Sequence, residues 1–453
     1  MLFTRKNLFS IIFPLIIQQA LSVTIGMIDS MMVASAGEAA VSGVSLVNTL
    51  DVLLIYAFSS LVTGGSIVVS QLFGKKDLAM VRSAAKQLLY VATAVATLLS
   101  TVVLLARFPL LSLLFGNVEA DVMANAQAYF FYLALSFPFL AISSGGTALY
   151  QCMGNSLISM LLSLLMNLIN VGGNALLIYG FNMGAAGAAI ATLFSRVVGA
   201  ILILIFLHNK KNLIYIEKLL HYKPDFAIIK RILRLGVPNG IENSMFQFGK
   251  LLTQSLISSM GTVSIAANAV AHTLATFQYM PGSAIGLATT TIVGRCIGAR
   301  EKEQAKKYSR LLVFITYVCL WCIVLFTCLF SKQIIGIYNL SEEASRLAQK
   351  LIIFHALSAA VIWPIAFTLP SSFKAASDVQ YTLRVSVFSM WTFRVALSYV
   401  FATKSISLFG LTIPGLGLGV FGVWLAMLVD WIFRTILFLI RYLSGRWLTK
   451  YKE

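Results

Sequence analysis

A series of long apolar runs constrains this chain more than any other feature. Of its 453 residues, 59% are hydrophobic and only 11% are charged. Because an α-helix rises about 1.5 Å per residue, about 20 apolar residues cross the roughly 30 Å of hydrocarbon in a bilayer. Such runs lie near residues 8–33, 46–72, 88–106, 125–150, 157–180, 186–207, 236–258, 270–297, 311–330, 347–370, 384–404 and 417–441. The sequence therefore predicts an all-α, polytopic membrane protein with about twelve transmembrane helices.

The net charge of +18 comes mostly from basic residues that gather in alternate loops. They are Lys75, Lys76, Arg82 and Lys86, followed by those within 210–234, 300–310, 374–384 and 441–452. Loops rich in Lys and Arg stay on the cytoplasmic side of a membrane, so the charge needs no nucleic-acid partner to explain it. We expect a multi-pass protein of the bacterial cytoplasmic membrane, with both termini in the cytoplasm.

The opening of the second half repeats the opening of the first. The shift that places Pro14 on Pro238 also places Gly37 on Gly261 and Gly74 on Gly298, without a gap. Each half holds an even number of spans, so both halves enter the membrane from the same side as parallel repeats. We predict two six-helix lobes around a central cavity: an N-terminal lobe at 1–207, a cytoplasmic linker at 208–235 and a C-terminal lobe at 236–453.

Asp29 lies in the first span, where a lipid-facing helix should carry no acid. An Asp near the centre of a membrane helix costs about 2.5 to 3.5 kcal/mol on insertion scales. Gln18, Ser22, Gly26 and Asp29 follow steps of four, four and three, so they form one polar or small stripe. The stripe indicates a bundle interior or a watery cavity. Asp29 either pairs within the packed bundle or serves transport, and we favour transport.

The seventh span is the most polar and carries Glu242, Asn243, Gln247 and Lys250. Two charges in one span exclude a helix that faces lipid on all sides. Glu242 also occupies the repeat position of Gln18. Neighbours could neutralise Glu242 and Lys250 in a purely structural role, but we favour a role in lining the substrate cavity.

Other polar positions inside the spans allow two interpretations. Asn167, Asn170 and Asn174 share a face of the fifth span and can act either as interhelical hydrogen-bonding groups or as ligands. Pro281 and Gly282 mark a place where the eighth span can bend, as alternating access requires, although static bundles also contain such kinks.

The remaining charged and reactive groups at membrane depth have simpler explanations. Asp430 and Arg434 are four residues apart and can pair on one helix, so we expect them to be structural together with Arg394. His272 and His355 are expected to be packed histidines rather than proton carriers. The five cysteines are scattered over the spans, and we expect no cofactor.

A set of motifs along the whole chain resembles the multidrug and toxic compound extrusion (MATE) transporters. The motifs are Pro14 with Asp29, Gln71-Leu-Phe-Gly74, the small-residue run 184–192, Met280-Pro281-Gly282, the run 293–299, Lys374-Ala-Ala-Ser377-Asp378, the run 391–394 and the run 422–430. The resemblance implies a twelve-helix, two-lobed antiporter that exports amphipathic, often cationic compounds. Inward flow of sodium ions or protons would drive the export.

The resemblance also implies a coupling-ion site in the N-terminal lobe. The family's roles map onto Asp29, Asn170, Asn174 and Thr192. Some proton-linked members carry an Asp where this chain has Asn174, and some place the acid of the seventh span about two turns deeper than Glu242. One carboxylate among neutral oxygens suits sodium, and a lone Asp can also cycle a proton, so both ions remain open with sodium preferred.

Three other classes of protein fit the sequence less well. A flippase for lipid-linked oligosaccharide precursors shares the two-lobed plan but needs a cationic cavity, for which Lys250 and Arg196 are the obvious candidates. A major-facilitator carrier would bear a different motif after the second span than Gly74-Lys75-Lys76-Asp77. A membrane enzyme would need a catalytic set that no span carries. We expect a monomer in membrane lipid that moves a small molecule without using ATP.

Overall fold

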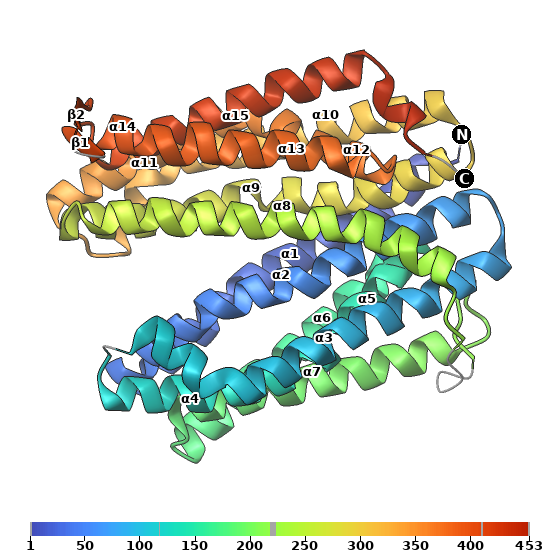
Figure 1. Cartoon of the computed structure of the whole chain (residues 1–453), viewed down its shortest axis with the longest axis horizontal. Coiled ribbons are helices and arrows are strands. Elements are labelled where there is room, and N and C mark those ends of the chain that lie inside the picture. The colour runs from blue at the N-terminus through green and yellow to red at the C-terminus, as the bar shows by residue number, and fades with distance from the viewer. Residues whose placement is uncertain (1, 117, 218–222, 409–410, 452–453) are drawn as a thin grey trace. The chain divides into compact units, whose positions relative to one another are not determined.

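A computed structural model describes residues 2–116, 118–217, 223–408 and 411–451. The chain divides into two compact units, unit 1 at Met1–Gly240 and unit 2 at Ile241–Glu453. Unit 1 consists of long helices joined by short turns (Figure 1). They are α1 (Arg5–Ala34), α2 (Glu38–Gly74), α3 (Leu78–Phe115), α4 (Ala120–Leu135), α5 (Phe137–Cys152), α6 (Ser156–Asn174), the π-helical η1 (Ala175–Gly180) and α7 (Gly184–His208).

Helix α8 (Phe226–Ser258) begins in unit 1, well before the expected start of the seventh span at position 236, and ends in unit 2. The other helices of unit 2 are α9 (Thr262–Gly298), α10 (Lys302–Gly336), α11 (Glu342–Trp363), η2 (Pro364–Thr368), α12 (Leu369–Ala375), α13 (Val379–Ser389), η3 (Met390–Ala396), α14 (Leu397–Ala402), α15 (Val420–Leu443) and η4 (Arg446–Thr449). A small antiparallel hairpin of β1 (Ser405–Leu408) and β2 (Leu411–Pro414) joins α14 to α15.

The helices confirm the prediction of an all-α membrane protein. Among the described residues, nine helices are long and apolar enough to span a bilayer, and α4 with α5, bent by 45°, adds a tenth. Helices α8 and α9 have 33 and 37 residues, which is enough to cross a bilayer. They are more polar than the others, and α8 carries Glu242 and Lys250. The sequence had anticipated neither the hairpin nor the π-helical segments.

The internal repeat is visible in the backbone. The shift that superposes the two halves of the sequence also superposes both ends of α2 on both ends of α9. Gly37 and Gly261 precede these helices with φ of 103° and 90°. Lys76 and Arg300 follow them in the left-handed region, with φ of 62° and 63°. Non-glycine residues rarely adopt a positive φ, so the shared conformation at equivalent positions indicates one duplicated turn design.

Side-chain caps explain several helix starts. Thr4, Asp77 and Ser341 each precede a helix and accept a hydrogen bond from the backbone N–H three residues later. Such caps satisfy donors that have no partner within the helix and are worth about 1 kcal/mol each. The cap at Asp77 fixes the start of α3 directly after the charged turn that follows α2.

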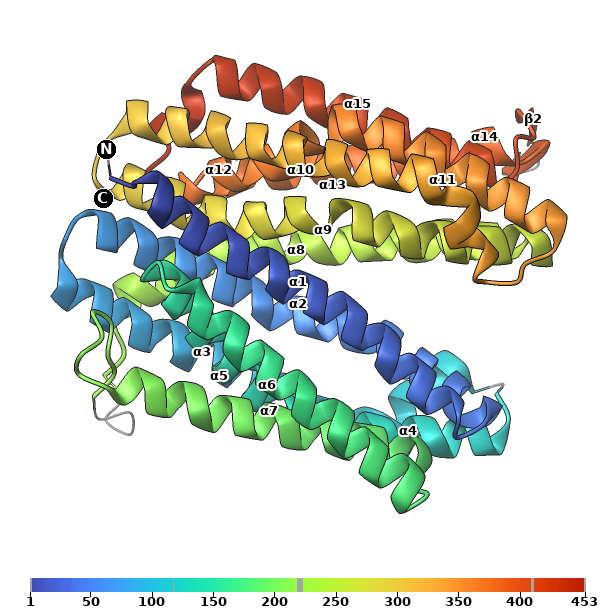
Figure 2. The same ribbon diagram turned by 180° about the vertical axis from the view of Figure 1, so that it is seen from behind.

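Within each unit, long helices pack side by side. In unit 1, α1 packs chiefly on α6, and α6 packs on α7 (Figures 1 and 2). In unit 2, α9 packs against α10, α11 and α12.

Helix α10 has an exposed apolar face. Its exposed residues Phe314, Val318, Trp321, Leu325 and Leu329 follow each other at steps of three and four residues. A continuous apolar stripe of this kind fits a helix that faces lipid.

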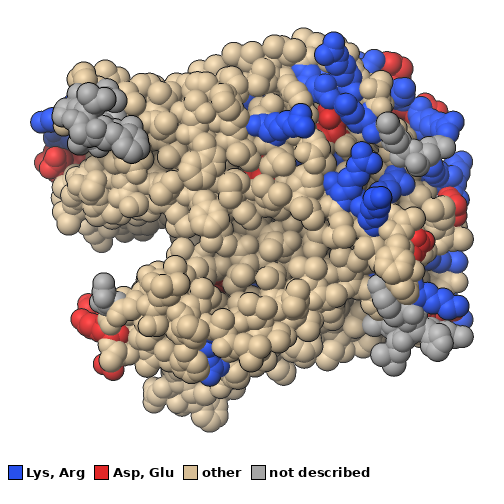
Figure 3. Space-filling view, in the orientation of Figure 1, with Lys and Arg blue, Asp and Glu red and all other residues tan. Residues whose placement is uncertain are grey.

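Basic side chains gather at one end of each unit (Figure 3). In unit 1 this is the end with the α2–α3 turn and the connection from α7 to α8. In unit 2 it is the end with the α9–α10 turn and the last turn of α15. The opposite ends, which include the β1–β2 hairpin, show few basic residues in this view. We call the basic end of each unit its basic face.

Candidate functional site

The packing of α1 on α6 brings Asp29 to the asparagines of the fifth span. Asn174 Nδ2 donates a hydrogen bond of 2.7 Å to Asp29 Oδ1. Asn170, one turn earlier on α6, lies on the same face, and only 6% of it is exposed. The three- and four-residue spacing noted in the sequence therefore points at the acid of α1, and the cluster lies within unit 1.

Asn170 connects this acid to α7. In the amide orientation that satisfies both of its polar atoms, Asn170 Nδ2 lies 2.8 and 3.1 Å from the two Asp29 oxygens. Its Oδ1 then accepts a hydrogen bond of 3.0 Å from Thr192 Oγ1. The same hydroxyl lies 2.9 Å from Ala188 O on its own helix, so its single proton is shared between these two acceptors. Asp29, Asn170, Asn174 and Thr192 thus form one polar cluster across α1, α6 and α7.

The cluster contains an acceptor without a donor. Asn174 Oδ1 is buried and has no hydrogen-bond partner among the described residues. An unsatisfied buried carbonyl costs about 1 to 3 kcal/mol, so native structures usually give such a group a partner. Asn174 is also the last residue of α6 before the π-helical η1, and π-segments inside α-helices often occur at functional sites. A cation at Asp29 would give Asn174 Oδ1 a partner if the amide turned.

A second buried acid, which the sequence reasoning had overlooked, lies on α2 of the same unit. Asp51 is 7% exposed, and its Oδ1 has no hydrogen-bond partner in the described part of the chain. Arg196 on α7 interacts electrostatically with both Asp29 and Asp51 and donates a 2.6 Å hydrogen bond to Ser136 Oγ. The signal in the sequence was the same as for Asp29, namely an acid inside an apolar run.

Gln18 and Ser22 lie on α1 away from this cluster. They precede Asp29 by three turns and two turns of helix, which places them about 16 and 10 Å away along the helix axis. The Ser22 hydroxyl donates to Gln18 O in its own helix, whereas Gln18 Oε1 is buried without a partner among the described residues. If Gln18 and Ser22 line a substrate cavity, they do so two to three helical turns away from the Asp29 cluster.

Glu242 is fully engaged within unit 2. Its carboxylate lies 3.1 Å from Lys374 Nζ and accepts hydrogen bonds from Thr382 at 3.2 Å and Ser386 at 3.0 Å. These partners come from α12 and α13, so the carboxylate joins three helices. Of the two interpretations of Glu242, these contacts favour the structural one. Asn243 and Gln247 follow on α8 and are only partly buried.

Three cations surround one aromatic ring in unit 2. Lys250, Arg394 and Arg434 lie 5.2, 5.4 and 5.4 Å from the centre of the Phe246 ring. Asp430 pairs with Arg434 at 2.7 Å and lies 3.9 Å from Arg394. Lys250 has no acidic partner within the described residues. The expected pairing of Asp430 with Arg434 is therefore present, while Lys250 leaves an excess of positive charge.

Comparison with known protein families identifies the family of this chain. The model of the MatE family matches residues 14–176 and 238–400, which together cover more than half of the chain. The two matches start at positions 14 and 238, which are related by the same shift as the repeats of the sequence and the backbone. The chain belongs to the MATE family of membrane transporters.

Two curated relatives align with this MATE chain over nearly its full length. The uncharacterized transporter YisQ of Bacillus subtilis is 25% identical to this chain. The alignment covers 98% of this chain and 95% of YisQ. The probable multidrug resistance protein NorM of Thermotoga maritima is 27% identical, with coverage of 98% and 93%.

Solved MATE structures share the fold. A crystal structure of MATE in the bent conformation gives a TM-score of 0.84 at 20% identity, covering 98% of this chain and 94% of that one. A MOP superfamily transporter from Pyrococcus furiosus, described with a binding pocket of reverse polarity, gives 0.83 at 20% identity, with coverage of 97% and 95%.

The predicted bending point of the MATE chain lies in a tightly packed part of α9. A Cβ on Gly282 would lie 2.1 Å from Trp363 Cζ3, so the glycine allows the indole to approach the helix backbone. Trp363 also stacks on Tyr279 and Phe367. Nearby, His355 is buried and lies 2.6 Å from Gln278 Oε1, which fits the expected packed histidine. The contact with Trp363 gives Gly282 a packing role, and the bend predicted at Pro281 and Gly282 stays a prediction.

Proposed function

We propose that the protein is a secondary active antiporter. It exports amphipathic, often cationic small molecules in exchange for Na⁺ or H⁺ by alternating access. The observation that carries the proposal is the cluster of Asp29, Asn170, Asn174 and Thr192, which three helices of unit 1 bring together. Many curated relatives are named as probable multidrug resistance proteins, which supports drugs or metabolites as the exported class.

The charges of unit 1 support a monovalent coupling ion. Asp29 and Asp51 together carry two negative charges, and Arg196 carries one positive charge. When both acids are ionised, these three side chains together carry a net charge of −1, which one Na⁺ or one H⁺ neutralises. Neutralisation matters at membrane depth because an uncompensated charge there costs several kcal/mol. Binding of the ion would thus stabilise a closed site, and its loss would favour an open one.

The ligand atoms favour Na⁺ slightly over H⁺. Asp29 supplies carboxylate oxygens, and Asn170, Asn174 and Thr192 supply neutral oxygens, the ligand type that hard cations prefer. The nitrogens of the two asparagine amides face Asp29, as Asn174 Nδ2 does at 2.7 Å and Asn170 Nδ2 does at 2.8 Å. We infer that Na⁺ binding turns the amide oxygens inward. A proton on Asp29 would instead leave an asparagine oxygen as its acceptor.

Exchange needs only that ion and substrate prefer different states of the transporter. If the ion stabilises the state open to the outside and the substrate the state open to the cytoplasm, each lowers the affinity for the other. The polar side chains proposed to contact the substrate are Gln18 and Ser22 in unit 1 and Asn243 and Gln247 in unit 2. We also propose a monomer in the cytoplasmic membrane, with both termini and the linker at 208–235 in the cytoplasm.

Thermal unfolding of the purified protein tests the ion site. A ligand that binds only the folded state raises its stability in proportion to RT ln(1 + [L]/Kd). We expect NaCl, but not choline chloride at the same ionic strength, to raise the midpoint of wild-type unfolding. D29N should show no such rise, whereas E38Q, which changes an exposed acid at the start of α2, should behave like wild type. Equal stabilisation of D29N and wild type by Na⁺ would contradict the proposal.

A flippase for lipid-linked oligosaccharide precursors is a second candidate, favoured by the cations of unit 2. Lys250, Arg394 and Arg434 outnumber the single carboxylate of Asp430 around Phe246, and such a surplus suits a pyrophosphate. If this function holds, K250Q should lower the transfer of a fluorescent lipid pyrophosphate across vesicle membranes and leave ethidium export unchanged. If K250Q has no effect on lipid transfer, the antiporter remains the better account.

A further inference from the structure

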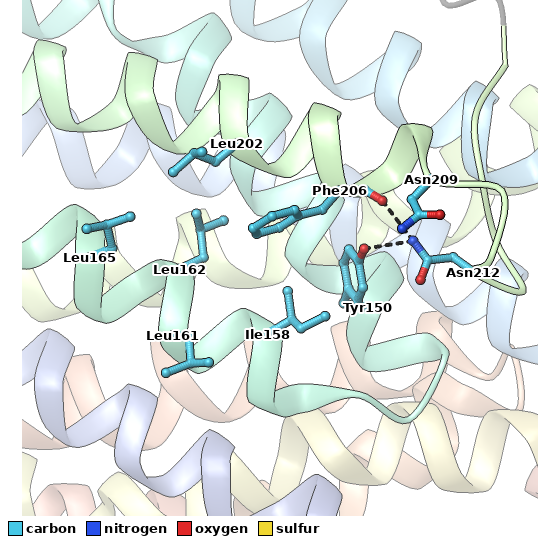
Figure 4. A pocket seen from close by; sticks show the side chains of 9 residues that line it. All are labelled: Tyr150, Ile158, Leu161, Leu162, Leu165, Leu202, Phe206, Asn209 and Asn212. Carbon is cyan, nitrogen blue, oxygen red and sulfur yellow. Dashed lines mark hydrogen bonds between the residues drawn. The ribbon is translucent and has the colours of Figure 1, made fainter.

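A pocket on the outer surface of unit 1 is separate from every group discussed so far. It lies between α5, α6 and α7, has a volume of about 300 Å³ and is shown in Figure 4. Its lining residues are Tyr150, Ile158, Leu161, Leu162, Leu165, Leu202, Phe206, Asn209 and Asn212. Pockets that bind small molecules start at about this size. The volume suits one narrow, flexible chain better than a rigid multi-ring compound.

The pocket has an apolar end and a polar end. Leu165 and Leu202 lie at one end, and the Tyr150 hydroxyl, Asn209 and Asn212 lie at the other (Figure 4). Leu162, which is 3% exposed, lines the buried side, whereas Leu161 is 50% exposed and lies toward the outside. An occupant must therefore be apolar along most of its length and polar at one end.

The pocket opens beside an exposed apolar stripe on α6. Leu157, Leu161, Leu165 and Leu168 are exposed at steps of four, four and three residues, which is one stripe along α6. In a bilayer such a stripe contacts acyl chains. The polar end of the pocket lies on the basic face of unit 1, where the connection from α7 to α8 begins. If the basic face is the cytoplasmic one, as the positive-inside rule predicts, phospholipid headgroups would lie at this depth.

Two hydrogen-bond donors at the polar end are available to a ligand. Asn212 Nδ2 donates to Tyr150 Oη at 2.9 Å, so the Tyr150 hydroxyl keeps its own proton for another acceptor. Asn209 Oδ1 accepts from the Lys211 backbone, while no bond of Asn209 Nδ2 is found among the described residues. Both donors suit the oxygens of a phosphate group.

Two lysines, Lys210 and Lys211, follow Asn209 directly in the sequence and favour a negatively charged headgroup. Glu217 lies 2.6 Å from Lys210 Nζ, and this bond raises the pKa of Lys210. Lys211 is exposed and has no acidic partner within the described residues. A basic residue near the membrane surface favours anionic lipid by about 1 kcal/mol, which corresponds to about a fivefold preference.

From this geometry we infer that the pocket binds one anionic phospholipid of the cytoplasmic leaflet. One acyl chain lies along Leu162 and Leu202, and the phosphate meets Asn209, the Tyr150 hydroxyl and Lys211. The lipid would bridge α6 and α7, the helices that carry Asn170, Asn174 and Thr192. The site does not depend on which ion or substrate the transporter uses.

Native mass spectrometry of the purified protein tests this site with phosphatidylglycerol and phosphatidylethanolamine of the same acyl chains. Wild type should retain one phosphatidylglycerol at about fivefold lower lipid concentration than phosphatidylethanolamine. L162W and L165W fill the pocket from its buried side and its open side, and both should lose this discrete binding. L168W, on the same helix face outside the pocket, should bind like wild type.

Charge and headgroup variants complete the test. K211Q should remove most of the preference for phosphatidylglycerol. K404Q, which changes a lysine between α14 and β1 in unit 2, should keep that preference. Glycerol phosphate without acyl chains should not compete. Equal binding of the two lipids by wild type would overturn the inference, as would unchanged phosphatidylglycerol binding by a folded L165W protein.

Discussion

Asn174 Nδ2 donates a 2.7 Å hydrogen bond to Asp29 Oδ1, which joins α6 to α1 across 145 residues of sequence. The same amide leaves its own oxygen buried without a partner among the described residues. One residue thus binds the carboxylate through its amide nitrogen and leaves an unpartnered amide oxygen in the same cluster. This pairing makes Asn174 the most informative neighbour of Asp29 to change.

N174A should weaken coupling-ion binding by about tenfold, which is about 1.4 kcal/mol, because it removes the amide oxygen that would become a ligand of the cation. Transport measured against Na⁺ concentration should therefore need a higher concentration for half-maximal rate. N167A provides the control, since Asn167 lies two turns earlier on α6 and outside the cluster. A normal Na⁺ dependence in N174A, with N167A also normal, would remove Asn174 from the site.

D51N tests the charge balance of unit 1. With Asp51 neutral, Asp29 and Arg196 cancel without any ion, so the drive to bind Na⁺ or H⁺ decreases. We expect at least a tenfold loss of ion affinity, which is about 1.4 kcal/mol, measured as the loss of Na⁺-dependent thermal stabilisation. E38Q on the same helix should behave like wild type. If D51N binds the ion as wild type does, Asp51 is only a structural acid.

E242Q should lower stability and spare ion coupling. Glu242 joins α8 to Lys374, Thr382 and Ser386, and removal of one partner of a buried ion pair costs about 3 to 5 kcal/mol. The midpoint of thermal unfolding in detergent should fall, while efflux per folded molecule keeps its ion dependence. E242Q/K374Q should recover part of the loss because no unpaired charge remains. An E242Q protein of normal stability that has lost ion dependence would contradict this assignment.

G282A should destabilise unit 2 by about 1 to 3 kcal/mol, the usual cost of overpacking a close contact. Its Cβ would lie 2.1 Å from the rigid indole of Trp363. G286A is the matched control one turn later, because its Cβ would meet only the Ser371 hydroxyl at 3.2 Å, and that side chain can rotate. The midpoints of thermal unfolding of G282A and G286A test this expectation. Equal midpoints would show that Trp363 can move aside at little cost in stability.

Much of the fold follows from the sequence alone. Each predicted run overlaps a long helix, a bent helix pair or a π-interrupted helix in the described part of the chain, because length and hydropathy are local properties and every span must cross the same bilayer. The internal repeat also persists in the backbone of α2 and α9, down to the positive φ of Lys76 and Arg300. Periodicity likewise placed Asn170 and Asn174 on one face of α6.

The partners across helices could not be predicted in the same way. Periodicity shows which side chains share a face, but not which helix that face meets. Lys374 lies on α12, four helices after the α8 residue Glu242, so nothing local indicated their ion pair. Asp51 carried the same signal as Asp29, an acid in an apolar run, yet only the packed unit shows it near Arg196 and Tyr129.

The most direct test of the central claim is ethidium efflux from inverted vesicles that contain wild type or D29N, with sodium and proton gradients imposed separately. Wild type should respond to one of the two gradients, with sodium preferred, and D29N should respond to neither. The responsive gradient then names the coupling ion. Gradient-driven efflux by D29N equal to that of wild type would contradict the assignment of Asp29 as the coupling site.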